Sequence, residues 1–291
     1  MKKLHFLLSG ILIICLIGSS SCAILNKSKG NDAPTLKFKI PVGQSLVFES
    51  EASSQIEMEQ MGQTISISSK STGKVKASSL EQLENTCKIE FETLAMTQNV
   101  ESPMGGGDTD FSEILGLKTT GILSAKGVLE ELEGFESYPT ISTAMGEDVT
   151  PDVFKMGLEQ LFFILPDEPV KKGSTWTEEI SNEMPYSGGT LSTTGQMIYE
   201  VLEKIIVEGH NCFKIKGTAE TKTSGTFEQQ GTEIILNRTT KINSDIIFSI
   251  DKGMYLSTVT STITDGIIDV PAANMTMPQK ITGKSSVKVI F

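Results

Sequence analysis

Residues 213–220, Phe-Lys-Ile-Lys-Gly-Thr-Ala-Glu, place an apolar or small side chain at every second position and a polar one between. Successive side chains of a β-strand point to opposite faces, so this pattern predicts a strand with one buried and one solvated face. The same alternation recurs in 36–40, 56–67, 87–92, 255–263 and 287–291. Strands of this kind are typical of antiparallel sheets. The sequence therefore predicts a mainly β fold, a large curved antiparallel sheet or half-barrel.

One segment, residues 151–165, has helical periodicity instead. Thr150 is a good N-cap and Pro151 fits the first helical position, while Pro166 ends the run. Apolar side chains follow at spacings of three and four, at Phe154, Leu158, Leu161 and Phe162. So wide an apolar arc predicts one buried helix packed against the sheet. These four side chains are the candidate lining of a hydrophobic site.

Short motifs recur on the two sides of this helix. Asn85-Thr86-Cys87-Lys88-Ile89 returns as Asn211-Cys212-Phe213-Lys214-Ile215, an offset of 126 (211 − 85), and Lys126-Gly127 returns as Lys252-Gly253 at the same offset. Gly43-Gln44-Ser45-Leu46 likewise resembles Gly173-Ser174-Thr175-Trp176. Such matches also arise by chance in chains rich in Ser and Thr. We expect a single domain over 36–291, made of two related halves, 36–149 and 167–291, joined by helix 151–165.

The N-terminus has the features of an export signal. Lys2 and Lys3 precede an apolar run over 6–17, and small residues follow up to Cys22. This pattern resembles a bacterial lipobox, with Ser19 where Leu is commonest, a relaxed form found in Bacteroidota and spirochaetes. The resemblance implies a signal peptide over 1–21, lipidation of Cys22 and a tether over 22–35. The membrane, reached through Cys22, is then a partner, and the location is the cell envelope, on the periplasmic or surface side of the outer membrane. An ordinary signal peptide cut nearby is the alternative.

Composition and charge exclude several classes of protein. The 291 residues carry 25 basic and 36 acidic side chains, a net charge of −11, and Arg238 is the single arginine. A chain so acidic lacks the basic stripe that neutralises phosphates, so we expect no nucleic-acid partner. Beyond the N-terminus no apolar run approaches the roughly 18–20 residues of a membrane-spanning helix, which argues against a polytopic membrane protein.

Catalytic and metal-binding motifs are scarce. His5 lies in the predicted signal, so His210 is the one histidine after it, in the turn-like Glu208-Gly209-His210-Asn211. No CxxC or HExxH spacing occurs. Neighbouring carboxylates such as Glu178-Glu179 point to opposite faces of a strand, so they do not form a catalytic pair. We expect no enzyme activity, no catalytic residue, no metal and no cofactor.

Two cysteines, Cys87 and Cys212, remain once the signal and the lipidated residue are set aside. In an exported protein they could form a disulfide, or each could be a small buried residue. A separation of 125 residues (212 − 87) gives no local reason for proximity, so we favour two buried thiols.

Residues 165–176, Leu-Pro-Asp-Glu-Pro-Val-Lys-Lys-Gly-Ser-Thr-Trp, contain the string Pro-Val-x-x-Gly-x-x-Trp. It resembles a motif of bacterial lipoproteins known only as a family of unknown function. Segments 42–45, 58–67, 102–108 and 124–130 fit that family too, so the likeness spans about 36–291. The resemblance implies β-rich envelope lipoproteins and no known activity.

The leading functional hypothesis is a non-enzymatic envelope lipoprotein that binds a hydrophobic ligand or a partner protein on the concave side of its sheet. An apolar helix over a half-polar sheet resembles lipoprotein carriers in architecture. Methionines such as Met58, Met96, Met156 and Met254 are further candidates for a lining. A purely structural or interaction lipoprotein with a filled core is the alternative, and a hydrolase is a third class. A cavity of ~300–1,000 Å³ favours the binder.

Overall fold

The computed structural model describes residues 33–291 except 61, 104, 147, 187 and 230. The predicted signal peptide and Cys22 lie outside the described residues. The first group of strands comprises β1 (Ser45–Gln60), β2 (Gln63–Gln82), β3 (Thr86–Glu101), β4 (Gly107–Thr109), β5 (Lys118–Ser124) and β6 (Leu129–Glu133). The second comprises β9 (Thr175–Tyr186), β10 (Gly189–Val207), β11 (His210–Gln229), β12 (Thr232–Ser249), β13 (Met254–Val270) and β14 (Met275–Ile290). Between them come β7 (Ile141–Ser142), β8 (Asp148–Val149) and α1 (Pro151–Glu159), and short 3-10 turns lie at Ser112–Ile114, Phe135–Ser137 and Pro271–Ala273.

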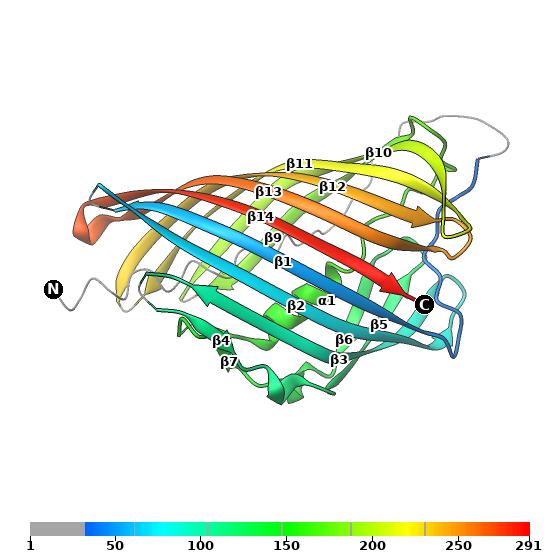
Figure 1. The fold of residues 1–291 in the computed structure, drawn as a ribbon, viewed down its shortest axis with the longest axis horizontal. Coiled ribbons are helices and arrows are strands. Elements are labelled where there is room, and N and C mark those ends of the chain that lie inside the picture. The colour runs from blue at the N-terminus through cyan, green and yellow to red at the C-terminus, as the bar shows by residue number, and fades with distance from the viewer. Residues whose placement is uncertain (1–32, 61, 104, 147, 187, 230) are drawn as a thin grey trace.

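Twelve of these strands form one curved antiparallel sheet, as the alternating sequence predicted. Its order is β6-β5-β3-β2-β1-β14-β13-β12-β11-β10-β9, with β4 paired to β3 beside this path. Strand β1 pairs with β14, so the two groups of strands meet inside the sheet. The sheet is not closed: β6 and β9 are its edges, and residues 134–174 connect them. This connection carries the β7–β8 hairpin and α1, and α1 lies within the curve of the sheet (Figure 1).

The predicted helix is present but ends at Glu159, six residues before the expected Leu165 (165 − 159). Residues 162–165 lie outside the helix, and two of their backbone groups have partners elsewhere in the chain. The indole N–H of Trp176 donates to the carbonyl of Ile164 at 2.8 Å, and the N–H of Leu165 donates to the carbonyl of Lys126 at 2.8 Å. Pro166 also disfavours a helical conformation at the residue before it.

Two consecutive phenylalanines after the helix both pack against the core. The Phe162 ring packs edge-on against Phe38, with 5.4 Å between centroids. The Phe163 ring lies 5.5 Å from that of Tyr199.

Residues 34–40 cross one end of the sheet. The N–H of Phe38 donates to Ala125 O, and that of Lys39 donates to Gly253 O, both at 2.8 Å. The carbonyl of Pro34, within the stretch expected to be tether, accepts from the N–H of Val170 at 2.9 Å. Apolar surface therefore covers this end of the curved sheet, contributed by the buried side chains of Leu36, Phe38 and Ile40.

Apolar side chains gather in two main clusters on the concave face. One lies near residues 34–40 and includes Leu46, Phe48, Ile89, Trp176, Phe248 and Val289. The other lies towards the opposite ends of the strands and includes Ile56, Met58, Leu191, Leu236, Ile268 and Met277. Cys87 and Cys212 are both buried free thiols, in agreement with the favoured prediction. The candidate site lies between these clusters.

Matching irregularities occur in the two groups of strands. Ile89 of β3 pairs with Ser79, whereas the preceding Lys88 pairs with Glu81, so β2 has a bulge between 79 and 81. Ile215 of β11 pairs with Val201, whereas Lys214 pairs with Glu203, so β10 has a bulge between 201 and 203. Both bulges face the residues that recur at an offset of 126 (215 − 89). A bulge re-aims the side chains that follow it, so both groups bend at matching places.

Candidate ligand-binding cavity

The middle of the concave face is lined by small side chains. Along β1, the inward positions run from large to small and back to large: Leu46, Phe48, Ser50, Ala52, Ser54, Ile56 and Met58. Alternate residues of a strand share one face, so three small residues in succession leave a hollow between the two apolar clusters. Strand β2 repeats this at Ser69, Ser71 and Gly73, and β13 does so at Thr258, Thr260 and Thr262.

Strand register places these small residues side by side. Ala52 pairs with Ser71 on β2 and with Ser285 on β14. Ser285 pairs in turn with Thr260, and Thr260 pairs with Ser244 on β12. Five adjacent strands thus contribute a continuous row that contains no large side chain. The sequence of any one strand does not reveal this row.

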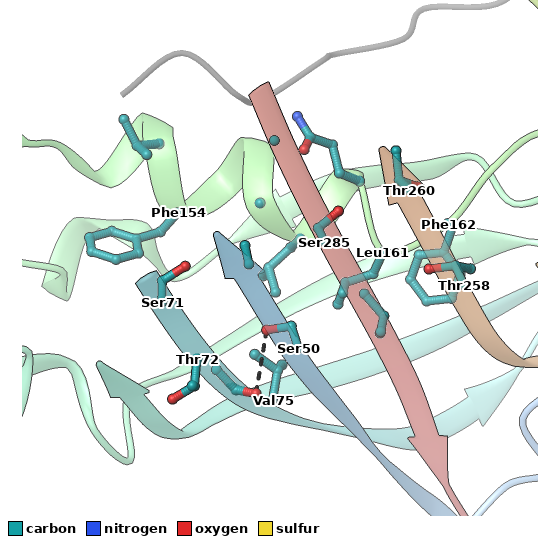
Figure 2. Close-up of a pocket in the computed structure, with 18 of the residues that line it drawn as sticks. Ser50, Ser71, Thr72, Val75, Phe154, Leu161, Phe162, Thr258, Thr260 and Ser285 are labelled. Carbon is teal, nitrogen blue, oxygen red and sulfur yellow. Dashed lines mark hydrogen bonds between the residues drawn. The ribbon is translucent and has the colours of Figure 1, made fainter. Parts of the chain in front are cut away.

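The helix and the segment after it cover this hollow. All four predicted lining residues, Phe154, Leu158, Leu161 and Phe162, border the cavity, and Leu158 and Phe162 are themselves buried. Figure 2 shows Phe154, Leu161 and Phe162 around the same cavity as Ser50, Ser71, Thr260 and Ser285. Apolar groups from the connection therefore face hydroxyl groups of the sheet.

The cavity has a volume of about 570 Å³. This lies within the range of ~300–1,000 Å³ that small-molecule sites occupy. Some floor hydroxyls are paired with one another: Ser244 Oγ and Thr260 Oγ1 lie 2.9 Å apart, and Ser50 Oγ donates to Gly73 O at 3.4 Å. Hydroxyls that are already paired tolerate an apolar neighbour better than unpaired ones would.

A buried glutamate is also among the residues around the cavity. Glu178 of β9 is 2% exposed, and its Oε2 accepts a hydrogen bond from the Tyr199 hydroxyl at 3.0 Å. Burial raises the pKa of Tyr199 well above its ordinary value, and the neighbouring Glu178 carboxyl raises it further, so the phenol stays protonated and donates. The Trp176 ring stacks on Tyr199, with centroids 5.1 Å apart, and fixes its position.

Sequence reasoning missed Glu178 as a site residue, although it placed Glu178 and Glu179 on opposite faces. Glu179 accepts a hydrogen bond from the Gln196 amide on the outer face, whereas Glu178 faces inward beside Trp176 and Ile180, which are both buried. The available signal was this alternation: an acid at an inward position between two large apolar residues is unusual.

The methionines contribute less than expected. Met96 borders the cavity, but Met58 and Met254 are packed inside the apolar clusters, and Met156 of α1 lies outside the lining. Met58 and Met254 lie near strand ends, where the two clusters are. Phenylalanine and leucine on one side, and serine and threonine on the other, form most of the wall.

Several other polar residues have structural roles. The Asp110 carboxylate accepts from the N–H of Ser112 at 2.8 Å, and Asp108 accepts from the Asn99 amide at 2.8 Å. His210 begins β11 directly after a tight turn at Glu208 and Gly209, whose φ angles are 51° and 81°. Within the described ranges, no group of three or more His, Cys, Asp or Glu side chains is arranged to hold a metal ion. No helix in that part of the chain is long and apolar enough to cross a membrane.

The fold and cavity define a class of protein, an open antiparallel sheet curved around an internal hollow that a connecting segment covers. The chain belongs to a family of unknown function (DUF6263), whose model matches residues 79–255, more than half of its length. This confirms the expectation that the chain belongs to an uncharacterised family of unknown function. A search of curated proteins gave no match.

Solved structures resemble the chain weakly. An outer membrane channel of Pseudomonas putida F1 (COG4313) is 10% identical, with 91% of this chain and 100% of that chain covered and a TM-score of 0.24. Pseudomonas aeruginosa OccK8 (OprE) is 7% identical, with 86% and 99% covered and a TM-score of 0.23. Similarity at these scores carries no argument about function.

Proposed function

We propose that this protein is a non-enzymatic lipoprotein of the cell envelope that binds a hydrophobic ligand between its sheet and the 151–163 segment. The observation that carries the proposal is the cavity of about 570 Å³, bordered by Phe154, Leu158, Leu161 and Phe162. Each Å² of apolar ligand surface that leaves water contributes about 25 cal/mol. A preformed apolar wall therefore favours hydrocarbon over water.

The predicted anchor fits this function. Acylation at Cys22 would hold the protein at a membrane, because each buried CH₂ contributes ~0.8 kcal/mol and multiple chains give stable attachment. The membrane is also a source of hydrophobic molecules. A purely structural role, the alternative expected from a filled core, receives no support from a hollow of this size.

Filling the cavity tests the proposal. Gly157 of α1 borders the cavity, and no heavy atom lies within 4 Å of the position that a Cβ would occupy there. A Cβ at this position therefore meets no neighbour, and we expect Gly157→Trp to place its indole in the ligand space. The control, Ser261→Trp, adds the same side chain at an exposed position on the outer face of β13.

Two measurements follow. Native mass spectrometry with lipid extraction, on protein purified from its own membrane, should detect a bound hydrophobic molecule in the wild type and in Ser261→Trp but not in Gly157→Trp. A neutral fluorescent probe, N-phenyl-1-naphthylamine, should show the same order of binding. Equal binding by all three proteins, or no binding by any, would contradict the proposal.

A further inference from the structure

The sheet side of the cavity is a broad floor rich in hydroxyl side chains. Three consecutive inward rows cross β2, β1, β14, β13 and β12, starting at Ser69, Ser71 and Gly73 and ending at Ile242, Ser244 and Ile246. All fifteen positions (3 × 5) border the cavity, nine of them are serine or threonine, and none of these described residues is charged. With strands about 4.8 Å apart and inward residues about 6.8 Å apart along a strand, the floor measures roughly 19 by 14 Å.

The hydroxyls of Ser71 and Ser285 are available to a ligand. Both residues are half-buried, and Ala52, which lies between them in the middle row, is exposed. Each hydroxyl oxygen is accessible and, in the described part of the chain, has no hydrogen-bond partner, whereas Ser244 and Thr260 bond to each other. Ser71 and Ser285 are two strand spacings apart, about 10 Å, so they do not bond to one another. Water or a polar group of the ligand therefore has to satisfy them.

The opposite side of the cavity offers hydrocarbon instead. Phe154, Leu158 and Leu161 border it from the connection. Figure 2 shows Ser71 and Ser285 on the side of the sheet where Phe154 and Leu161 lie. Hydrocarbon laid against the floor would strip water from the two hydroxyls without replacing its hydrogen bonds, and polar groups laid against the cover would lose their own water in the same way. The cavity therefore favours a ligand with one polar and one apolar face.

The breadth of the floor bears on the shape of this ligand. A single hydrocarbon chain covers a narrow strip of such a floor, whereas a fused-ring skeleton covers a wide area. We propose that the ligand is a rigid fused-ring amphiphile of the polyhydroxylated steroid type. Its hydroxyl face lies on Ser71 and Ser285, and its hydrocarbon face packs under Phe154 and Leu161. This inference rests on the proposed function and narrows its ligand class.

Cholate and 5β-cholanate, each titrated as monomers against the full chain, test the inference. They share one skeleton and one side-chain carboxylate, but cholate alone carries hydroxyls on the rings, all on one face. Ser71→Ala/Ser285→Ala should lower the ratio of cholate to cholanate affinity at least about tenfold, because lost hydrogen bonds to the ligand weaken cholate alone. The matched control, Ser66→Ala/Ser261→Ala, removes two exposed hydroxyls from the outer face of β2 and β13 and should keep the wild-type ratio.

The outcomes separate this inference from the proposed function. If Ser71→Ala/Ser285→Ala keeps the wild-type ratio, or if cholate binds Gly157→Trp as tightly as wild type, the inference is overturned. If neither probe binds wild type although native mass spectrometry detects a hydrophobic molecule, the inference is overturned while the proposed function stands. If mass spectrometry and N-phenyl-1-naphthylamine also show no binding, the proposed function itself fails.

Thermal melting of each variant confirms that it is folded. If the double variant does not fold, the single variants Ser71→Ala and Ser285→Ala take its place, and each should lower the ratio of cholate to cholanate affinity by at least about threefold. An unchanged ratio in both single variants would overturn the inference in the same way.

Discussion

Gly43 and Gly173 make the same hydrogen bonds in the two groups of strands. The N–H of Gly43 donates to Ser79 O at 3.0 Å, and that of Gly173 donates to Val201 O at 2.7 Å. Their φ angles are 78° and 80°, and each is the third residue of a turn closed by a hydrogen bond from the fourth residue to the first. These are the features of a type II turn, which favours glycine at this position.

This equivalence predicts matched effects of substitution. Gly43→Ala and Gly173→Ala should each lower the free energy of unfolding by about 1–2 kcal/mol, since an L-residue is strained at positive φ while space is available for the methyl group. Urea denaturation measures the free energy of unfolding of each variant. Gly157→Ala, in a helix with open space, should instead raise the free energy of unfolding by up to about 1 kcal/mol. Unequal losses at Gly43 and Gly173 would argue against equivalent turns.

Phe162 is expected to be a main stabilising contact between the connection and the sheet. Its ring packs edge-on against Phe38 and Phe48, and the side chain is 5% exposed. Phe162→Ala should lower the free energy of unfolding by about 3–5 kcal/mol, through lost burial and the cavity left behind. Ile206→Ala, at a side chain 75% exposed, is the control and should change it by less than about 0.5 kcal/mol.

The free energy of unfolding is expected to fall at alkaline pH because the phenol of Tyr255 is buried. Burial raises the pKa of its phenol above the ordinary value near 10. Above pH ~10 the unfolded chain ionises this group while the folded protein keeps it protonated, so unfolding releases a proton and stability falls as the pH rises. Tyr255→Phe removes this contribution. Denaturant melts between pH 8 and about 11 should show a shallower decline for the variant than for wild type; parallel curves would contradict the prediction.

The lipidation site is tested in cells. Cys22→Ala should abolish labelling by a palmitate analogue and release the protein from membranes or leave its signal uncut, because the acceptor thiol is gone. Cys15→Ala, within the predicted signal, is the control and should be labelled like wild type. Equal labelling of Cys22→Ala and wild type would show that Cys22 is not the anchor.

The sequence predicted part of the site and missed the rest for a definable reason. Phe154, Leu158, Leu161 and Phe162 were recognisable as apolar residues at spacings of three and four in one segment, although Leu161 and Phe162 lie beyond the end of α1. The end of the helix was not recognisable. The carbonyl of Ile164 accepts a hydrogen bond from Trp176, and the N–H of Leu165 donates one to Lys126, and both partners lie in other segments of the chain. Local propensity cannot weigh such hydrogen bonds.

Alternation of apolar and polar residues by itself determined the fold class. Side chains of a strand point alternately to its two faces, so a sheet with one buried face requires an apolar residue at every second position. It also determined that Glu178 and Glu179 face opposite sides. Only the tertiary structure decided that the small residues Ala52, Ser285 and Thr260 lie in one row, since pairing across strands fixes register and the sequence of one strand does not. The cavity results from that register, and it is the reason that a sheet with an apolar cover has space for a ligand.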